Sequence, residues 1–210
     1  MFDPVLIVLV VGSILISMTL HEAMHAFVGY WLGDDTARSQ GRLTLNPLAH
    51  IDPFMTVMLP LLLMIMQLPP FGAAKPVPFN PNRVKYGEFG AALVGAAGPV
   101  TNLVLAMFAG GMLRVFGSAA GGILPEVLSI FTLVNLAFFL FNIIPFPPLD
   151  GSRVLYALAP DPVRGVMRQI EASGPVALFG FFVLFYLLLS EPFVRLLYFL
   201  FGVFTGSNLA

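Results

Sequence analysis

Residues 4–32, PVLIVLVVGSILISMTLHEAMHAFVGYWL, form an apolar segment that the pentapeptide HEAMH interrupts at positions 21–25. An apolar helix of about 20 residues crosses a bilayer, so this segment is long enough to do so. His21 and His25 are four residues apart and fall on one helix face, where both can bind one metal ion, with Glu22 beside it. Zn²⁺ suits such a site. Ionisable groups at membrane depth are costly and usually functional, which disfavours the alternative of two packed core histidines.

The composition is that of a membrane protein with several spans. The chain has 210 residues, of which 58% are hydrophobic and 10% charged, and its mean hydropathy is +0.92. The net charge of −1 and the lack of a basic cluster give no indication of a nucleic-acid partner. The absence of cysteine excludes disulfides and thiolate metal ligands. We therefore expect an all-α polytopic membrane protein that forms a single domain over residues 1–210.

Four segments are long enough to cross a hydrocarbon layer. A fifth apolar piece, residues 54–68, makes a helix of only about 22 Å against a core of about 30 Å. We predict a re-entrant or interfacial hairpin there, followed by a small extended or β element near residues 70–80, where prolines disfavour a helix. In the last segment, the sequence SEP at 190–192 leaves open whether the chain forms one span or a hairpin. The four predicted spans are residues 4–32, 89–114, 125–147 and 174–204.

The basic residues favour one orientation in the membrane. If residues 54–68 turn back instead of crossing, only Arg114 lies on one side, with Arg195 inside the last segment. Lys and Arg concentrate on the cytoplasmic side, and a crossing fifth segment would satisfy that rule less well. The N-terminus is then outside, and the HEAMH half of the first span meets the end of the third span at the cytoplasmic face. The basic residues on the cytoplasmic side are Arg38, Arg42, Lys75, Arg83, Lys85, Arg153, Arg164 and Arg168.

A catalytic zinc ion usually has three protein ligands, so His21 and His25 need a partner. Asp150 stands out among the carboxylates because it directly follows the uncharged run NIIPFPPL at 142–149, whose prolines cannot continue a regular helix. Such a break can aim Asp150 inward. From the residues alone, two roles for Asp150 stay open: a metal ligand, or the N-cap of a short helix over residues 152–159.

Several motifs together resemble the site-2 protease family of intramembrane zinc metalloproteases. They are HEAMH at 21–25, GPVTN at 98–102 and NIIPFPPLDG at 142–151. The stretches GRLTLNPLAHIDP at 41–53 and AKPVPFNP at 74–81 resemble its short prokaryotic branch, which lacks PDZ and CBS domains. The resemblance covers about residues 10–160. The chain departs from the family pattern at Ser152, where many relatives have a second glycine, and at Met55, where the short branch often has glycine.

The resemblance implies a zinc metalloendopeptidase with one Zn²⁺ per chain and a catalytic core over about residues 4–160. It makes Asp150 the third zinc ligand. Glu22 lies where it can take a proton from a water at the metal and act as general base. The family further implies an active site open to the cytoplasmic side of a prokaryotic inner membrane. Its substrates are transmembrane segments of other proteins in the bilayer, held in unwound form along an extended edge near residues 75–79.

Three further polar residues are considered for a role at the site or in the fold. Asn102 and Asn142 are candidates for a hydrogen bond to the oxyanion or to the substrate backbone. For Asn102 an interhelical hydrogen bond is the favoured alternative, and Asn142 also suits a role in ordering the bend. His50, in a loop, is predicted to be structural or exposed and not a zinc ligand.

Two alternative functions remain open from the sequence. One is a metal transporter, although a transporter has no obvious use for Glu22. The other is an inactive protease-like scaffold.

Overall fold

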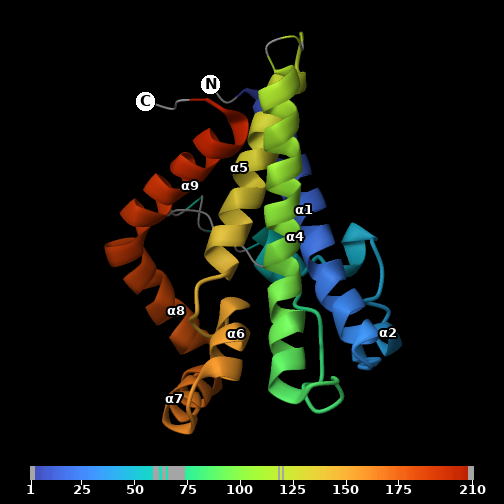
Figure 1. Cartoon of the computed structure of the whole chain (residues 1–210), viewed down its shortest axis with the longest axis vertical. Helices are drawn as coiled ribbons and strands as arrows, with labels where there is room; N and C mark the ends of the chain where they lie inside the picture. Colours follow the sequence, from blue (N-terminus) through green and yellow to red (C-terminus); the bar gives the residue numbers. More distant parts are fainter. Residues whose placement is uncertain are drawn as a thin grey trace.

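The computed structural model describes residues 3–58, 62, 65, 74–117, 119 and 121–207. Within them, four helical units are long and apolar enough to span a membrane, so the prediction of an all-α polytopic membrane protein is confirmed. Figure 1 shows α1, α4 and α5 side by side, with a fourth, bowed unit made of α8, η3 and α9 beside them. Their bounds are α1 Pro4–Trp31, α4 Gly87–Phe116, α5 Leu124–Asn142, α8 Pro175–Leu184, the π-helical η3 Phe185–Leu189 and α9 Ser190–Thr205.

The shorter helices connect these spans. Figure 1 shows α2, α6 and α7 at the end of the bundle opposite the two chain termini. Residues 74–80 form neither a helix nor a paired strand, and the described part of the chain contains no strand at all. We call residues 74–80 the strap. The short helices are α2 Thr36–Ser39, the 3₁₀-helical η1 Pro47–Ala49, the π-helical η2 Pro53–Met58, α6 Gly151–Leu158 and α7 Asp161–Ala172.

The predicted hairpin over residues 54–68 falls largely outside the described residues. Its first positions belong to η2, and residues 62 and 65 are helical. The other positions between 59 and 69, and residues 70–73 of the predicted extended element, lie outside the described residues. The re-entrant course of this segment therefore stays a prediction.

Helix α1 begins where its sequence provides a start signal and remains apolar over most of its length. The Asp3 side chain accepts a hydrogen bond of 2.9 Å from the Val5 amide, and Pro4 takes the first helical position, where its missing N–H costs nothing. The helix has 28 residues and is thus about 42 Å long, more than a hydrocarbon core needs. Large apolar side chains such as Val8 and Ile16 are exposed along it, as expected for a lipid-facing surface.

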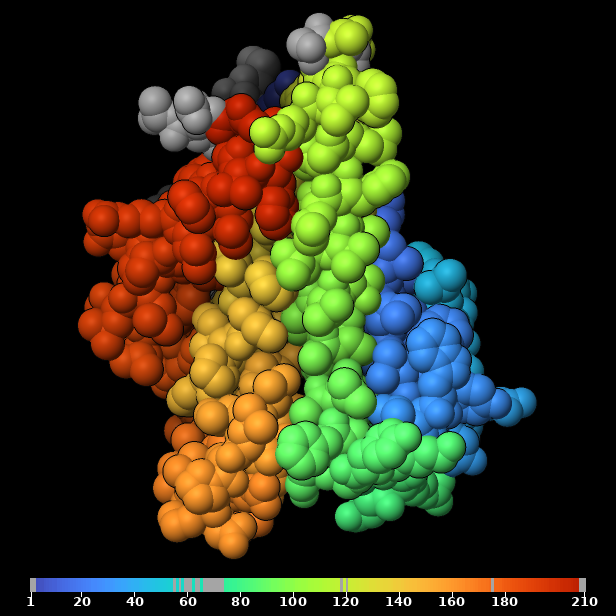
Figure 2. Space-filling model, in the orientation of Figure 1, coloured from blue at the N-terminus to red at the C-terminus, as the bar shows by residue number. Residues whose placement is uncertain are grey.

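Helix α4 is the centre of the bundle and packs against α1, α5, α6 and α9. In the space-filling view it runs the height of the front face (Figure 2). Glycines permit this close packing: a Cβ on Gly110 would lie 2.9 Å from Cβ of Phe204 and 3.3 Å from Cγ2 of Thr132. On the same side, Ala106, Leu136 and Phe201 form a buried cluster among α4, α5 and α9. The small residues thus bring α1, α5 and α6 close enough to α4 to build a site between them.

The C-terminal unit is a single bent helix and not a hairpin. Residues 176–205 form one continuous candidate span, and the two chain termini lie at the same end of the bundle (Figure 1). Pro192 lies in the first turn of α9, where it lacks the N–H that a straight helix would use, and the π-helical turn η3 immediately precedes it. The bend near Pro192 therefore redirects the helix without reversing it. Of the two alternatives that the sequence left open, the structure has the single span.

Candidate metal centre

Helix α1 presents His21 and His25 on the face that packs against α4. Both side chains are buried, with exposed fractions of 6% and 8%. Their Nε2 atoms lie 3.1 Å apart. The i, i+4 spacing in a helix puts the two rings on adjacent turns of one face, so their convergence follows directly from the sequence.

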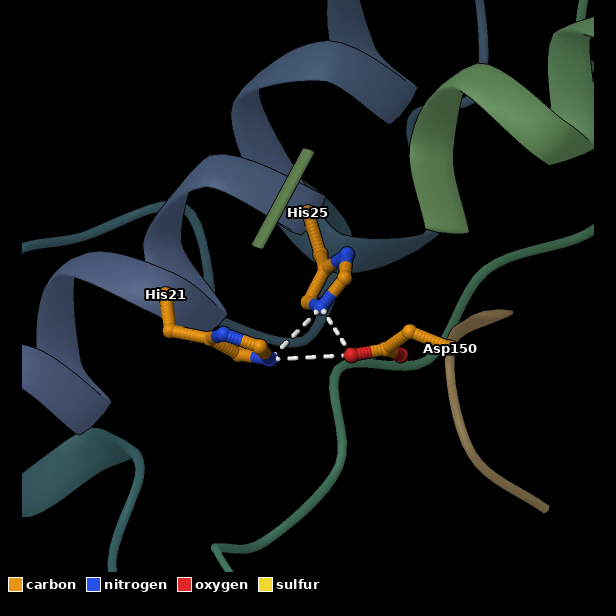
Figure 3. A group of neighbouring side chains, drawn as sticks. All are labelled: His21, His25 and Asp150. Carbon is orange, nitrogen blue, oxygen red and sulfur yellow. Dashed lines mark hydrogen bonds and ion pairs between the residues drawn. The ribbon is translucent and has the colours of Figure 1, made fainter. Parts of the chain in front are cut away.

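Asp150 reaches the same point from the break after α5. Helix α5 ends at Asn142, five residues before the predicted end of this span, because the proline-containing run that follows cannot continue it. Asp150 occupies the N-cap position of α6, but its carboxylate makes no capping hydrogen bond. Instead its Oδ2 lies 3.0 Å from Nε2 of His21 and 3.4 Å from Nε2 of His25 (Figure 3). Of the two roles left open for Asp150, this contact favours the metal ligand.

The glycine after Asp150 is required by the close approach of the backbone. A Cβ on Gly151 would collide with the carbonyl group of Ile143 and lie 2.7 Å from the carbonyl oxygen of Ile144. Only a residue without a side chain can therefore start α6 at this distance from the end of α5. Gly151 thus folds the chain back so that Asp150 faces α1.

The ring nitrogens that converge at this point are acceptors. Nδ1 of His25 lies 2.7 Å from the backbone carbonyl oxygen of Val94, which can only accept, so Nδ1 carries a proton and, in the neutral imidazole, Nε2 has a free lone pair. Nδ1 of His21 lies 2.6 Å from Oδ1 of Asn102, which likewise makes Nδ1 the donor. Two lone pairs and a carboxylate oxygen therefore point at one another. A metal ion, or a proton on one Nε2, offsets the repulsion among these three atoms.

The spacing of the three atoms suits zinc. Atoms that are each about 2.0–2.1 Å from a tetrahedral ion lie about 3.3 Å from one another. The observed separations of 3.0, 3.1 and 3.4 Å match this value. In the part of the chain that the structure describes, His21, His25 and Asp150 form the cluster of His, Asp and Glu side chains suited to a metal ion.

Gly98 of α4 leaves the room that this cluster needs. A Cβ at this position would lie 2.6 Å from both Cε1 and Nε2 of His21, and it would also collide with Nε2 of His25. Gly98 thus leaves a space on the surface of α4 at the point where the two imidazoles converge. The donor set and this open space both fit a bound ion.

Glu22 lies next to the cluster without belonging to it. It is buried, with 9% of its surface exposed, and its Oε2 accepts a hydrogen bond of 3.1 Å from the backbone amide of Val77 in the strap. One carboxylate oxygen is therefore fixed by the strap. The Glu22 carboxylate thus lies outside the group formed by His21, His25 and Asp150.

The strap is held against the end of α1 by buried polar side chains that the sequence analysis did not single out. Oδ2 of Asp34 accepts a hydrogen bond of 2.6 Å from the Asn80 amide, and Nη2 of Arg42 donates to the Lys75 carbonyl. Burial raises the pKa of the Asp34 carboxyl, but hydrogen bonds from Thr36 and Asn80 outweigh this effect and hold that pKa below its usual value. Arg42 lies inside the GRLTLNPLAHIDP stretch, where its charge indicated only a loop on the cytoplasmic side.

The structure gives the remaining candidates different surroundings. The Asn102 amide nitrogen donates to Oδ1 of Asn135 at 2.9 Å, so the interhelical hydrogen bond that the sequence favoured is present. Nδ2 of Asn142 donates to the Phe138 carbonyl at 3.0 Å, near the end of α5. His50 is completely buried and its Nε2 donates to the Thr44 carbonyl at 2.9 Å, apart from the metal cluster.

Comparisons with known proteins identify the family. The chain is 41% identical over 180 residues to "Putative zinc metalloprotease YwhC" of Bacillus subtilis, covering 81% of this chain and 78% of the relative. The chain belongs to the site-2 protease family of zinc metalloproteases. It is also 29% identical over 209 residues to "Putative zinc metalloprotease Rip2" of Mycolicibacterium smegmatis, covering 96% of this chain and 75% of the relative. No family model and no solved structure matches the chain.

Membership in this family makes the chain a zinc metalloprotease of the membrane. Zn²⁺ is its cofactor, in agreement with the fit of the cluster of His21, His25 and Asp150 to a metal ion. The four apolar helical units make it an integral membrane protein.

Proposed function

We propose that this member of the site-2 protease family is an intramembrane endopeptidase that hydrolyses peptide bonds in or near transmembrane segments of other membrane proteins. His21, His25 and Asp150 hold one zinc ion, and Glu22 is the general base. The observation that carries the proposal is the meeting of three metal-binding acceptors and one separate carboxylate inside a bundle of membrane-spanning helices. A hydrolase needs both elements.

Each side chain has a defined task in this reaction. Bound zinc supplies Lewis-acid polarisation of the scissile carbonyl and lowers the pKa of water at the site. Glu22 takes the proton from the attacking water and returns it to the leaving amine. Its Oε2 is fixed by the Val77 amide, so Oε1 is the oxygen that receives the proton. The Asn102 oxygen faces His21, and its amide donates to both Asn135 and the Ser17 carbonyl, so its hydrogen bonds are used. The Asn142 amide donates one hydrogen to the Phe138 carbonyl and has a second N–H, so Asn142 is our candidate for the oxyanion or substrate contact.

We further propose that the site opens toward the cytoplasmic side of a prokaryotic inner membrane. The site lies in the half of α1 that is farther from the chain termini, on the side of α2, α6 and α7 (Figure 1). Basic residues such as Arg38, Arg153 and Arg164 belong to these short helices, and Arg114 belongs to the opposite end of α4. This distribution supports a cytoplasmic location for the site end, because Lys and Arg are retained on that side.

The decisive experiment replaces Glu22 by Gln in the purified, zinc-loaded protein with a transmembrane reporter substrate. We expect Glu22→Gln to lose at least about 100-fold in kcat, as for a lost general base, and to keep one zinc per chain. The matched control is Glu88→Gln, which makes the same chemical change on an exposed glutamate of α4 and should cleave normally. Cleavage by Glu22→Gln at the wild-type rate contradicts the proposal. Zinc flux into proteoliposomes without cleavage by the wild type would favour the transporter instead.

The helical state of the substrate gives a second test. A transmembrane helix satisfies all its own backbone hydrogen bonds, so it must unwind before a peptide carbonyl reaches the site. A substrate with Gly-Pro near the scissile bond should therefore be cleaved faster than one with Leu at the same positions. Equal rates for the two substrates would contradict an intramembrane cleavage mechanism.

A further inference from the structure

Arg42 is a buried cation that the proposed chemistry does not yet use. Only 5% of its surface is exposed. Nη2 donates to the carbonyl oxygen of Lys75 and lies 3.5 Å from that of Pro76, so the guanidinium holds two successive carbonyl groups of the strap. Its Nε is buried without a hydrogen-bond partner.

Burying a guanidinium is costly, so an isolated arginine at this position would reduce stability. Burial lowers the pKa of Arg42, and the negative charge of Glu22 opposes this shift. Arg42 is thus within electrostatic reach of the carboxylate beside the metal cluster. Two opposite charges taken out of water together cost less than one charge alone, and this explains how the protein tolerates Arg42 where it lies.

The strap connects the two charges through its backbone. Pro76 and Pro78 have no N–H group, so Val77 is the only amide donor between Lys75 and Phe79. That single donor binds Oε2 of Glu22 at 3.1 Å. The two carbonyls that Arg42 holds come directly before it in the chain. A shift of the strap away from Arg42 would therefore move the one amide that fixes Glu22.

We propose that Arg42 is a positioning residue for Glu22: it holds the Lys75 and Pro76 carbonyls so that the Val77 amide fixes one oxygen of the carboxylate and leaves the other for the attacking water. This inference rests on the proposed function, because it assigns Arg42 a role through the general base. Arg42 itself touches neither the metal cluster nor, by this account, the substrate. Its removal should slow the chemical step and leave zinc binding intact.

The kinetic test compares Arg42→Gln, Arg42→Lys and the control Arg38→Gln. Arg38 is an exposed arginine of α2, whose loss should change kcat by less than about twofold. We expect Arg42→Gln to lower kcat by about 100-fold, the usual cost of misplacing a catalytic group by about 1 Å, with zinc content unchanged. Arg42→Lys keeps the charge and a group that donates hydrogen bonds, and should recover part of kcat. This conservative variant preserves the test if Arg42→Gln fails to fold.

A second measurement follows the strap itself and needs no activity. The chain has no cysteine, so Val77→Cys introduces a single thiol on a half-buried residue of the strap and keeps the backbone amide. Combining it with Arg42→Gln should raise the rate of thiol labelling by about 10-fold, since the strap loses its anchor. Combining it with Arg38→Gln should leave that rate unchanged.

The results separate the two proposals. Wild-type kcat in both Arg42 variants, while Glu22→Gln is inactive, overturns the role of Arg42 and leaves the proposed function standing. An unchanged labelling rate in Arg42→Gln also overturns it. Full cleavage by Glu22→Gln contradicts the proposed function itself. A loss of zinc from the folded Arg42→Gln protein would show that Arg42 supports the ligands and not Glu22, and would overturn the inference.

Discussion

His21 and Asn102 share a hydrogen bond of 2.6 Å inside the bundle, where at most 6% of either residue is exposed. The hydrogen bonds of Asn135 determine which atom of Asn102 faces His21. Nδ2 of Asn135 donates to the Phe131 carbonyl, which can only accept, and this turns Oδ1 of Asn135 toward Nδ2 of Asn102. Oδ1 of Asn102 must then face His21. A short chain of amides between α4 and α5 therefore sets which nitrogen of His21 is free for the metal.

Replacing Asn102 by Leu should weaken zinc binding by about 10- to 100-fold, the usual effect of losing the group that orients a ligating histidine. Leu has a similar size but cannot accept the proton of His21 Nδ1. The matched control is Thr101→Val, since the Thr101 hydroxyl donates to the Ala97 carbonyl of its own helix, and this variant should keep the wild-type affinity. Zinc competition with a fluorescent chelator measures both. Equal affinities for the two variants would contradict the orienting role.

Replacing Gly98 by Ala should remove zinc from an otherwise folded protein. The new methyl group would lie 2.6 Å from Nε2 of His21, in the space where the imidazoles converge. We expect the zinc affinity to fall by more than about 100-fold, beyond what loss of an orienting partner causes. Gly111→Ala is the control on the same helix, because a Cβ there meets nothing within 4 Å. Elemental analysis after gel filtration distinguishes them, and full zinc occupancy in Gly98→Ala would contradict the assigned geometry.

His50→Gln should keep one zinc per chain and lose stability. His50 is completely buried, its ring bonds the Thr44 carbonyl, and its own carbonyl accepts from the Lys75 amide. A buried side-chain hydrogen bond contributes about 1 kcal/mol, and an unsatisfied partner adds to the loss, so we expect a decrease of about 1–3 kcal/mol in unfolding free energy. Thermal unfolding and zinc content measure the two effects. A folded variant without zinc would show that His50 belongs to the metal site after all.

Asp34→Asn should destabilise the metal-free protein near pH 7 and have no effect in acid. The pKa of Asp34 is lowered in the folded protein, so its carboxylate contributes stability above its unfolded pKa of about 3.9 and loses that contribution as pH falls through the lower folded value. We therefore expect a difference of about 1–3 kcal/mol at pH 7 that shrinks below about pH 4. Unfolding measured against pH checks this. A difference that persists in acid would mean that the charge of Asp34 is not what holds Asn80.

Much of the fold follows from sequence because the signals are local. The ends of α1 and α4 lie within two residues of the predicted ends, since apolar length, Pro4 and the flanking polar residues define them. The predicted end of α5 is wrong by five residues, because the run after Asn142 is apolar enough to resemble a span while its prolines prevent a helix. The sequence does not predict the path of the chain after Pro192, because proline alone does not distinguish a bend from a reversal.

The candidate site, like the fold, has some contacts that local sequence predicts and others that it does not. The pairing of His21 with His25 follows from helix geometry alone. The contact of His21 with Asp150 joins positions 129 residues apart. The break before Asp150 and the distribution of basic residues leave the ligand role open beside that of an N-cap, and the resemblance to the family favours the ligand. The sequence could not predict the role of Arg42, because its partners are backbone carbonyls 33 and 34 residues away. Every residue has a backbone carbonyl, so the residue types do not show which carbonyls Arg42 contacts.

The convergence of His21, His25 and Asp150 also makes the cofactor a cross-link. An ion bound there links the first helix to a loop 129 residues further along the chain, and so closes a large loop of the polypeptide. Because the unfolded chain has no preformed site, the free energy of metal binding adds to the free energy of folding. Chelation should loosen the junction between α5 and α6 as well as abolish hydrolysis, so this enzyme is expected to lose rigidity and activity together.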